Sequence, residues 1–269
     1  MKRSGEGLKT VTAGIITLTT SQIDDFLRDP LDGMGPCQMS ETLPWTALAT
    51  TGVVPGARIL MAELEGKGAK LTGQGNLNRK LVEKLMDHWP DDEAAEVRSI
   101  SKVVNEWDFN PAMYLHAVLR VARLVRHEKG YLKLTRKGRA LLPEDAAGRL
   151  QALLFRTTFT RFNLAYLDRW DEPNPFKPQI SLILYLMAQV FTDWRSVDAL
   201  LRTVTIPMVN KLDSRPLSRP ESFFELRVLR YLCWFGLVEQ AAHANDDFFA
   251  SRLYRRTPLY DRTLSFVLS

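Results

Sequence analysis

Apolar residues recur along much of this chain at the three- and four-residue spacing that places them on one face of a helix. One such run contains Leu77, Leu81 and Leu85, with Asn76 as the expected N-cap and Pro90 as the residue that ends the helix. Between such runs lie short segments rich in β-branched residues and turn residues. The pattern predicts a mainly α-helical protein with short β-hairpins.

The clearest pattern begins at Asn110, which is expected to cap a helix that has Pro111 in its first position. An apolar stripe of leucine, valine and alanine follows on one face of this helix. The helix continues into LVRHEKGYLKL, where two β-like arms flank Lys129-Gly130 and predict a hairpin. Thr135 is then expected to cap another helix.

A glycine-rich stretch, GKGAKLTGQGN at residues 66–76, has two interpretations: a loop that binds phosphate, or a connection between regular elements. A Walker loop requires Lys-Ser/Thr after its second glycine, but Gln74 follows Gly73. The dinucleotide-binding pattern requires a third glycine where Leu71 stands. The stretch also matches residues 133–140, where a strand and a threonine precede a helix. We therefore interpret it as a structural connection.

The order helix, hairpin, threonine, helix occurs again near the C-terminus, in FFELRVLRYLCWFGLVEQ and RLYRRTPLYDRTLSF. The repeat predicts two similar units joined by a helical bridge. Near the N-terminus, residues 10–18 resemble a strand, and residues 29–56 resemble irregular loops because they are rich in proline and glycine. The predicted division is an N-terminal segment that packs on the first unit (1–56), the first unit (57–143), a helical bridge and linker (144–178) and the second unit (179–269).

Composition is that of an ordinary soluble globular protein, with 45% apolar and 25% charged residues in 269 and a net charge of +5. The longest apolar run, residues 182–191, is about half the length that crosses a bilayer. The first residues lack the apolar core of a signal peptide. Cys37 and Cys233 lie far apart and are interpreted as reduced thiols. These features predict a cytoplasmic protein without a membrane partner.

Basic residues are concentrated between Arg120 and Arg139, where eight of them stand against Glu128 alone and give the window a charge of +7. At 100° per residue, His116 shares a helix face with Arg120 and Arg123. Phosphate contacts require such clustering, although a solvated helix face produces it too. The candidate nucleic-acid-binding residues are His116, Arg120, Arg123, Arg126, Lys129, Lys133, Arg136, Lys137 and Arg139.

A helix ending near Leu-Val, a hairpin and then Leu-Thr-x-x-Gly resembles the winged-helix domains of bacterial regulators of the MarR type. The middle copy carries the Leu134-Thr135 and Gly138 of this motif, with Arg123 where the family has glycine. In the C-terminal copy, Gly236 stands at that place and Pro258 lies near the position of the later glycine. The resemblance covers about 30 to 50 residues of each unit. It implies that the helix before the hairpin enters the major groove of double-stranded DNA and that the hairpin, or wing, contacts its backbone.

The second unit has more acidic residues around its wing, which favours a role in packing or dimerisation. It is also rich in aromatic residues, some of which are expected to face a second chain and form a homodimer through residues 179–269. These aromatic residues are Phe223, Phe224, Tyr231, Trp234, Phe235, Phe248 and Phe249.

Catalytic motifs are not found. The four histidines lack His-Glu-x-x-His spacing, two cysteines cannot build a thiolate zinc site, and no Gly-x-Ser-x-Gly elbow occurs. We therefore predict a DNA-binding, transcription-regulator-like protein without catalytic residues, metal or cofactor. The alternative is a non-catalytic protein-interaction scaffold with the same winged-helix shape and an accessory role.

Overall fold

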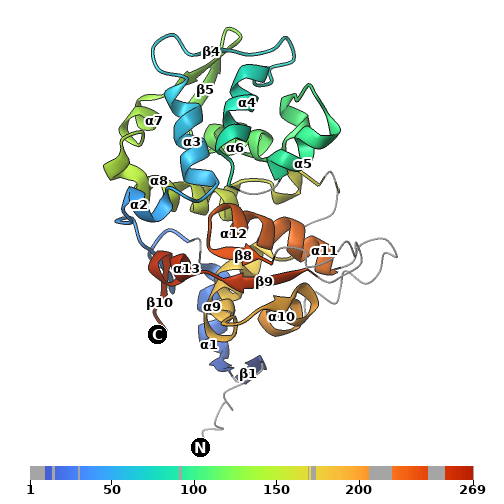
Figure 1. The fold of residues 1–269 in the computed structure, drawn as a ribbon. Coiled ribbons are helices and arrows are strands. Elements are labelled where there is room, and N and C mark those ends of the chain that lie inside the picture. The colour runs from blue at the N-terminus through green and yellow to red at the C-terminus, as the bar shows by residue number, and fades with distance from the viewer. Residues whose placement is uncertain are drawn as a thin grey trace, which may run out of the picture. The chain divides into compact units, whose positions relative to one another are not determined.

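The computed structural model describes residues 10–13, 16–29, 31–90, 93–168, 170, 174–205, 220–241 and 252–268. The chain forms two compact units. The central unit contains residues 40–172 and 231–237, and the terminal unit contains residues 1–39, 173–230 and 238–269. Both are mainly helical with small antiparallel sheets (Figure 1), which confirms the predicted mainly α class with short hairpins.

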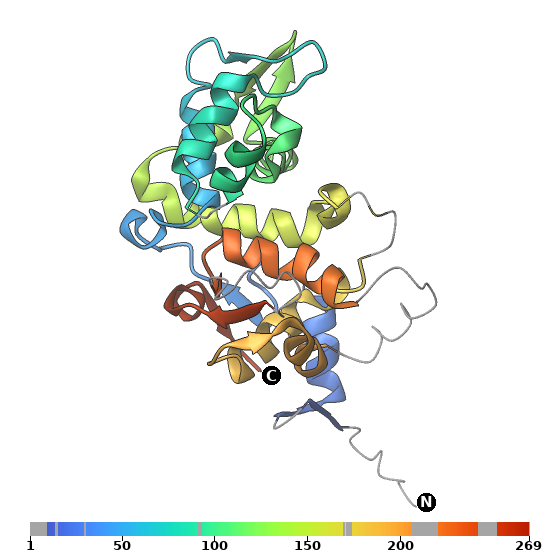
Figure 2. The same cartoon turned by 45° about the vertical axis from the view of Figure 1, so that its right-hand side comes forward.

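Helices of the central unit surround α6 (Asn110–Val121), which contacts α3 (Val53–Ala62), α4 (Arg79–His88) and strand β5 (Val125–Glu128). The hairpin of β5 and its partner strand projects from these helices (Figure 2). The remaining elements of the unit are α2 (Trp45–Leu48), β4 (Ala69–Lys70), α5 (Glu93–Ile100), η1 (Glu106–Asp108), β6 (Tyr131–Leu134), α7 (Arg136–Ala140), η2 (Glu144–Ala146), α8 (Ala147–Arg156), the π-helical η3 (Thr157–Arg161) and η4 (Leu164–Tyr166).

The core of the central unit contains a cluster of aromatic rings. The Tyr114 ring, which is fully buried, lies 5.6 Å from the ring of Phe162 and 5.3 Å from that of Trp234. Trp234 belongs to α12 (Arg230–Trp234), so the C-terminal part of the chain completes this core. Rings at these separations in edge or tilted arrangements stabilise a core beyond their buried area. The core therefore depends on residues that are more than one hundred positions apart.

The central sheet has the strand order β4-β6-β5. Its hairpin turns at Lys129 and Gly130, with φ angles of 50° and 78°. Two consecutive positive φ angles are typical of the tight turn whose twist matches paired strands. Thr135 then caps α7, because its side chain accepts a hydrogen bond from the Gly138 N–H at 3.0 Å. The hairpin and this cap confirm the two predictions made from the sequence.

The terminal unit contains a sheet of the same design, with the order β7-β9-β8. In each unit a two-residue strand pairs antiparallel with the second arm of a hairpin. The elements of the terminal unit are β1 (Thr10–Ala13), β2 (Ile16–Thr19), α1 (Thr20–Arg28), β3 (Cys37–Met39), η5 (Lys177–Gln179), α9 (Ile180–Val190), β7 (Arg195–Ser196), α10 (Val197–Val204), α11 (Pro220–Phe224), the π-helical η7 (Glu225–Leu229), β8 (Val238–Gln240), β9 (Leu253–Arg256), α13 (Pro258–Thr263) and β10 (Leu264–Phe266).

The N-terminal segment is divided between the two units, whereas the prediction placed the whole segment on the first unit. In α1, the Phe26 ring stacks on that of Tyr185 in α9 at 4.8 Å, and β3 pairs with β10. Residues 16–39 thus pack on the terminal unit, because the apolar face of α1 is complementary to the apolar α9, while residues 40–56 belong to the central unit. The predicted loop also contains regular structure, since α2, β3 and the start of α3 lie within residues 29–56.

Two helix starts differ from the prediction. The side chain of Asn78, not that of Asn76, accepts a hydrogen bond from the Leu81 N–H and caps α4. Phe109 is the N-cap residue of α6, and Asn110 is its first helical residue. Each shift is of one or two residues, which is the usual variation in where a helix begins. No helix of the described ranges is long and apolar enough to cross a membrane.

Candidate nucleic-acid interface

Alternation of side chains along β5 and β6 gives the central hairpin two different faces. Its inner face packs on the core through Val125, Leu132 and Leu134, which are buried. Its outer face carries Arg126 and Lys133, which lie opposite each other in the register. Two basic residues that are seven positions apart in the sequence are therefore neighbours on one surface.

A cavity of about 490 Å³ lies beside this surface. Its lining includes four of the predicted basic residues, Arg126, Lys133, Arg136 and Arg139. Arg126 and Lys133 come from the hairpin, whereas Arg136 and Arg139 come from α7. The Thr135 cap fixes the position of α7 relative to the hairpin, because its hydroxyl lies 2.9 Å from the backbone oxygens of Arg123 and Leu124.

Glu128 neutralises part of this charge. Its carboxylate pairs with Arg126 at 2.7 Å and accepts a hydrogen bond from the Lys133 ammonium. The hydrogen bond from Lys133 is the main reason why the pKa of Glu128 lies below its ordinary value, and the charge of Arg126 adds to this effect. Within the described part of the chain, no carboxylate forms an ion pair with Arg136 or Arg139.

A second basic group lies at the end of α6. The Lys137 ammonium donates a hydrogen bond to the Ala122 backbone oxygen at 3.3 Å. Its pKa is lowered, first by partial burial and then by the charges of Arg161 and Arg123. Arg161 comes from η3 and was not among the predicted residues, since nothing in the sequence connects it with a hairpin that lies more than 20 positions earlier.

Arg123 takes a backbone conformation that is unusual for its side chain. Its φ of 60° is left-handed, as is the φ of 73° at Gly236, the residue at the same place before the terminal hairpin. A glycine adopts this conformation without strain, whereas an arginine has a cost of about 1 kcal/mol or more. The central unit therefore keeps a cation at a position where the backbone favours glycine.

The predicted basic face on α6 is corrected by the structure. Arg120 is the one exposed residue of this helix, whereas His116 is buried. The helix is covered on most sides because it lies at the centre of the unit, so the simple helical wheel placed His116 beside Arg120 without showing what packs over it. The wing residues Lys129 and Arg126 are exposed, as the prediction required.

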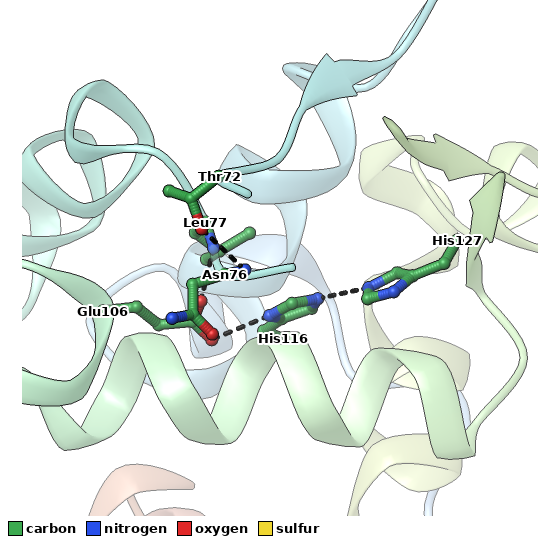
Figure 3. Close-up of polar contacts among 6 residues, drawn as sticks. All are labelled: Thr72, Asn76, Leu77, Glu106, His116 and His127. Carbon is green, nitrogen blue, oxygen red and sulfur yellow. Dashed lines mark hydrogen bonds and ion pairs between the residues drawn. The ribbon is translucent and has the colours of Figure 1, made fainter. Parts of the chain in front are cut away.

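His116 belongs to a chain of hydrogen bonds (Figure 3). Its Nδ1 lies 2.7 Å from the Glu106 carboxylate in η1, and its Nε2 lies 2.8 Å from His127 Nε2 in β5. Glu106 and His116 are 5% and 6% exposed, whereas His127 is exposed. These hydrogen bonds thus connect the buried Glu106 side chain with His127 on the first strand of the hairpin.

Leu77, which directly follows the glycine-rich stretch, contacts Glu106 at the buried end of this chain of hydrogen bonds. The Leu77 N–H donates a hydrogen bond to Glu106 (Figure 3). The Thr72 N–H donates to the Asn76 backbone oxygen at 2.9 Å. The Asn76 N–H donates in turn to the Thr72 hydroxyl at 3.1 Å. The contact of this region with Glu106 is therefore a single backbone N–H, that of Leu77, while the bonds between Thr72 and Asn76 close the loop on itself.

The pKa of His127 is lowered, first by burial and then by the nearby charges of Arg120 and His116, while Glu106 acts in the opposite direction. Sequence reasoning did not find Glu106 or His127. The three residues belong to three different elements, η1, α6 and β5, so the period of a single helix or strand does not connect them. No group of three or more potential metal-ligating side chains occurs among the residues that the structure describes.

Comparison with known proteins places a similarity on this part of the chain. A family model described as the Y4jL N-terminal domain matches residues 49–148. The uncharacterized protein y4jL of Sinorhizobium fredii is 39% identical over 88 residues, which are 32% of this chain and 40% of that protein. No solved structure matches the chain.

The family match includes the glycine-rich loop, the Glu106–His116–His127 chain and the basic hairpin. It lies within the central unit and does not reach the terminal unit. The alignment also covers less than half the length of the relative. The similarity therefore concerns the central unit.

Proposed function

We propose that the central unit binds nucleic acid through phosphate contacts made by the β5–β6 hairpin and α7. The observation that carries this proposal is the cavity lined by Arg126, Lys133, Arg136 and Arg139. Phosphate groups are bound by arginine and lysine side chains gathered on one surface. Glu128 offsets one of these four charges, so the lining keeps an excess of positive charge.

The arrangement of strands supports a winged-helix description of the unit. A short strand that pairs with the second arm of the hairpin, and a helix that precedes the hairpin, agree with the resemblance to MarR-type domains. That resemblance implies double-stranded DNA as the partner. The burial of α6 argues for backbone contacts over reading of bases, because Arg120 is the one residue of this helix that is exposed.

The experiment compares two variants of equal charge. In the first, the four cavity residues are replaced: Arg126→Gln, Lys133→Gln, Arg136→Gln and Arg139→Gln. The control removes four exposed cations of the same unit that belong neither to the hairpin nor to α7: Arg79→Gln, Lys80→Gln, Lys102→Gln and Arg149→Gln. Folding of both variants is checked by circular dichroism. Binding of a short random-sequence duplex is then measured at several salt concentrations.

The cavity variant is expected to bind the duplex more than about tenfold more weakly than the wild type. The slope of log affinity against log salt is expected to be shallower by about 0.9 for each phosphate that the variant no longer neutralises. The control variant should stay within about threefold of the wild type, since its charges act at longer range. Equally weakened binding in the two variants would reject a localised site. A wild type without duplex affinity at about 50 mM salt would reject DNA binding and favour the protein-interaction scaffold.

The aromatic residues that led to the prediction of a homodimer do not support it. Phe223, Phe224, Tyr231, Trp234 and Phe235 are all buried within the chain itself, so they do not supply an exposed aromatic surface. Phe248 and Phe249 lie outside the described residues. The nucleic-acid proposal therefore does not depend on a second copy.

A further inference from the structure

We propose that the central unit binds an unpaired nucleobase in a second cavity, beside the cavity proposed to bind phosphate. This inference rests on the proposed function, because it names the kind of nucleic acid that the same site prefers. The second cavity, the apolar cavity, has a volume of about 710 Å³ and lies within the range typical of ligand sites. Its apolar lining includes Trp45, Ile59, Ala62, Leu142 and Pro143.

The apolar cavity adjoins the basic cavity at two points. Arg139 on α7 lines both cavities. Glu65 lines the apolar cavity, and Gly66, the next residue, lines the basic one. Because a single sugar joins the base and the phosphate of a nucleotide, one nucleotide can occupy both cavities. Sites for unpaired strands combine a basic path for the backbone with a surface for the bases in this way.

The charges around the two cavities indicate which part of a nucleotide each would hold. In the apolar cavity, Arg58 and Arg139 are offset by Glu65 in the lining and by Glu144, which lies 3.6 Å from the Arg58 guanidinium. The described lining of the basic cavity contains four cations and no carboxylate, although Glu128 pairs with two of them. The basic cavity therefore favours a phosphate, and the apolar cavity favours an uncharged group such as a base.

Arg58 and Trp45 together form a surface on which a base can stack. The Arg58 guanidinium lies over the Trp45 ring, 4.3 Å from its centroid. Its Nε donates a hydrogen bond to the Leu142 backbone oxygen at 2.9 Å, which holds the guanidinium in place without a ligand. Unpaired bases stack on aromatic rings and on arginine planes. A fully paired duplex keeps its bases inside the helix, so it leaves this surface empty.

The test compares two DNA ligands that carry the same number of phosphates. Each is the same short duplex with a single-stranded extension of about five nucleotides, a length within the usual site size. The extension has thymine bases in one ligand and abasic sites in the other. Binding is measured by fluorescence anisotropy at one salt concentration. We expect the wild type to bind the ligand with bases roughly tenfold more tightly, which is the effect of one stacked base.

Two variants locate the base. Ala49→Leu combined with Ala62→Leu fills the apolar cavity from two exposed positions of its lining and leaves the core unchanged. This filled variant should bind both ligands equally, with the affinity that the wild type has for the abasic one. Arg58→Lys keeps the charge but removes the planar guanidinium, so it should lose most of the preference for bases.

The matched control is Ala95→Leu combined with Ser99→Leu. It adds two leucine side chains at exposed positions of α5, which line neither cavity. The control should keep the preference of the wild type, because its added apolar surface lies outside the proposed site. Circular dichroism checks the folding of all variants.

The outcomes separate this inference from the proposed function. Equal binding of the two ligands by the wild type, or an unchanged preference in the filled variant, would overturn the base site and leave phosphate binding intact. A wild type that binds neither ligand would overturn both. If the filled variant does not fold, Arg58→Lys decides the question by the same comparison.

Discussion

The two three-stranded sheets of this protein share one design but surround their cations differently. In the terminal sheet, Arg255 pairs with Glu239 at 2.6 Å, directly across the strands. In the central sheet, the residues at the same two places are Lys133 and Arg126, so two cations face each other. The terminal hairpin thus has an ion pair directly across its strands, whereas the two facing cations of the central hairpin share one carboxylate, that of Glu128.

Other arginines of the terminal wing also have carboxylate partners. Arg256 pairs with Asp261 at 2.8 Å, and Arg252 pairs with Glu225 at 3.0 Å. In the central wing, Glu128 serves Arg126 and Lys133 together. The comparison teaches that a count of basic residues is a poor guide to a phosphate site, because the number of nearby carboxylates decides how much charge is left.

The helix after each hairpin shows a second difference. Thr135 and Thr257 are both N-cap residues, so Gly138 and Tyr260 occupy the same helical position. The counterpart of Gly138 is therefore a fully buried tyrosine, two residues after the Pro258 that the sequence placed near this position. Gly138 allows α7 to approach the Leu124 backbone, whereas the Tyr260 hydroxyl donates to the Leu184 oxygen at 2.6 Å.

The largest expected effect comes from Gly138→Ala, because Gly138 is the residue that allows α7 to approach the Leu124 backbone. A Cβ at Gly138 would clash with the Leu124 backbone oxygen, so α7 or the hairpin must shift. We expect the free energy of unfolding to fall by about 2 kcal/mol, which exceeds the gain of up to about 1 kcal/mol from better helix propensity. Urea denaturation measures this change. Tyr260→Phe, which removes one hydrogen bond, should cost about 1 kcal/mol. An unchanged stability in Gly138→Ala would mean that the close approach is not required.

The next effect comes from making the central wing resemble the terminal one. Arg126→Glu places a carboxylate opposite Lys133, as Glu239 stands opposite Arg255. We expect duplex affinity to fall by roughly tenfold, because the cavity loses one cation and gains an anion that pairs with a second. Fluorescence anisotropy with a labelled duplex measures this decrease. Glu239→Gln in the terminal wing is the control, and a similar decrease there would show that the comparison of the two wings is misleading.

The smallest effect concerns pH and stability. The residue of the terminal hairpin that corresponds to His127 is Gln240, so His127→Gln again copies one wing onto the other. Because the folded pKa of His127 is below its ordinary value of 6.5, the unfolded chain binds this proton at the higher pH. The stability that the neutral ring contributes is therefore present above about pH 6.5 and is lost as the pH falls through the folded pKa.

Chemical denaturation between about pH 7.5 and pH 5 measures this dependence. The wild type should lose stability on acidification more steeply than His127→Gln does. Identical slopes in the wild type and His127→Gln would contradict the lowered pKa.

Much of the central hairpin could be predicted from local pattern. The Lys129-Gly130 turn, the alternating arms and the Thr135 cap each depend on residues that are close in the sequence. Helix types were predictable for the same reason, although the caps of α4 and α6 shifted by one or two residues. The basic cavity was partly predictable, because its four cations lie within 14 residues of one another.

The sequence by itself determined the helical class, the two similar hairpins and the concentration of positive charge near residues 120–139, since spacing and local turns encode these features. Only the tertiary structure decided which of those charges remain exposed and that His116 is buried between Glu106 and His127. It also decided that residues 231–237 complete the core around Tyr114. The physical reason is that burial and hydrogen-bond partners depend on side chains far apart in the chain, and no periodicity in a single sequence records those distances.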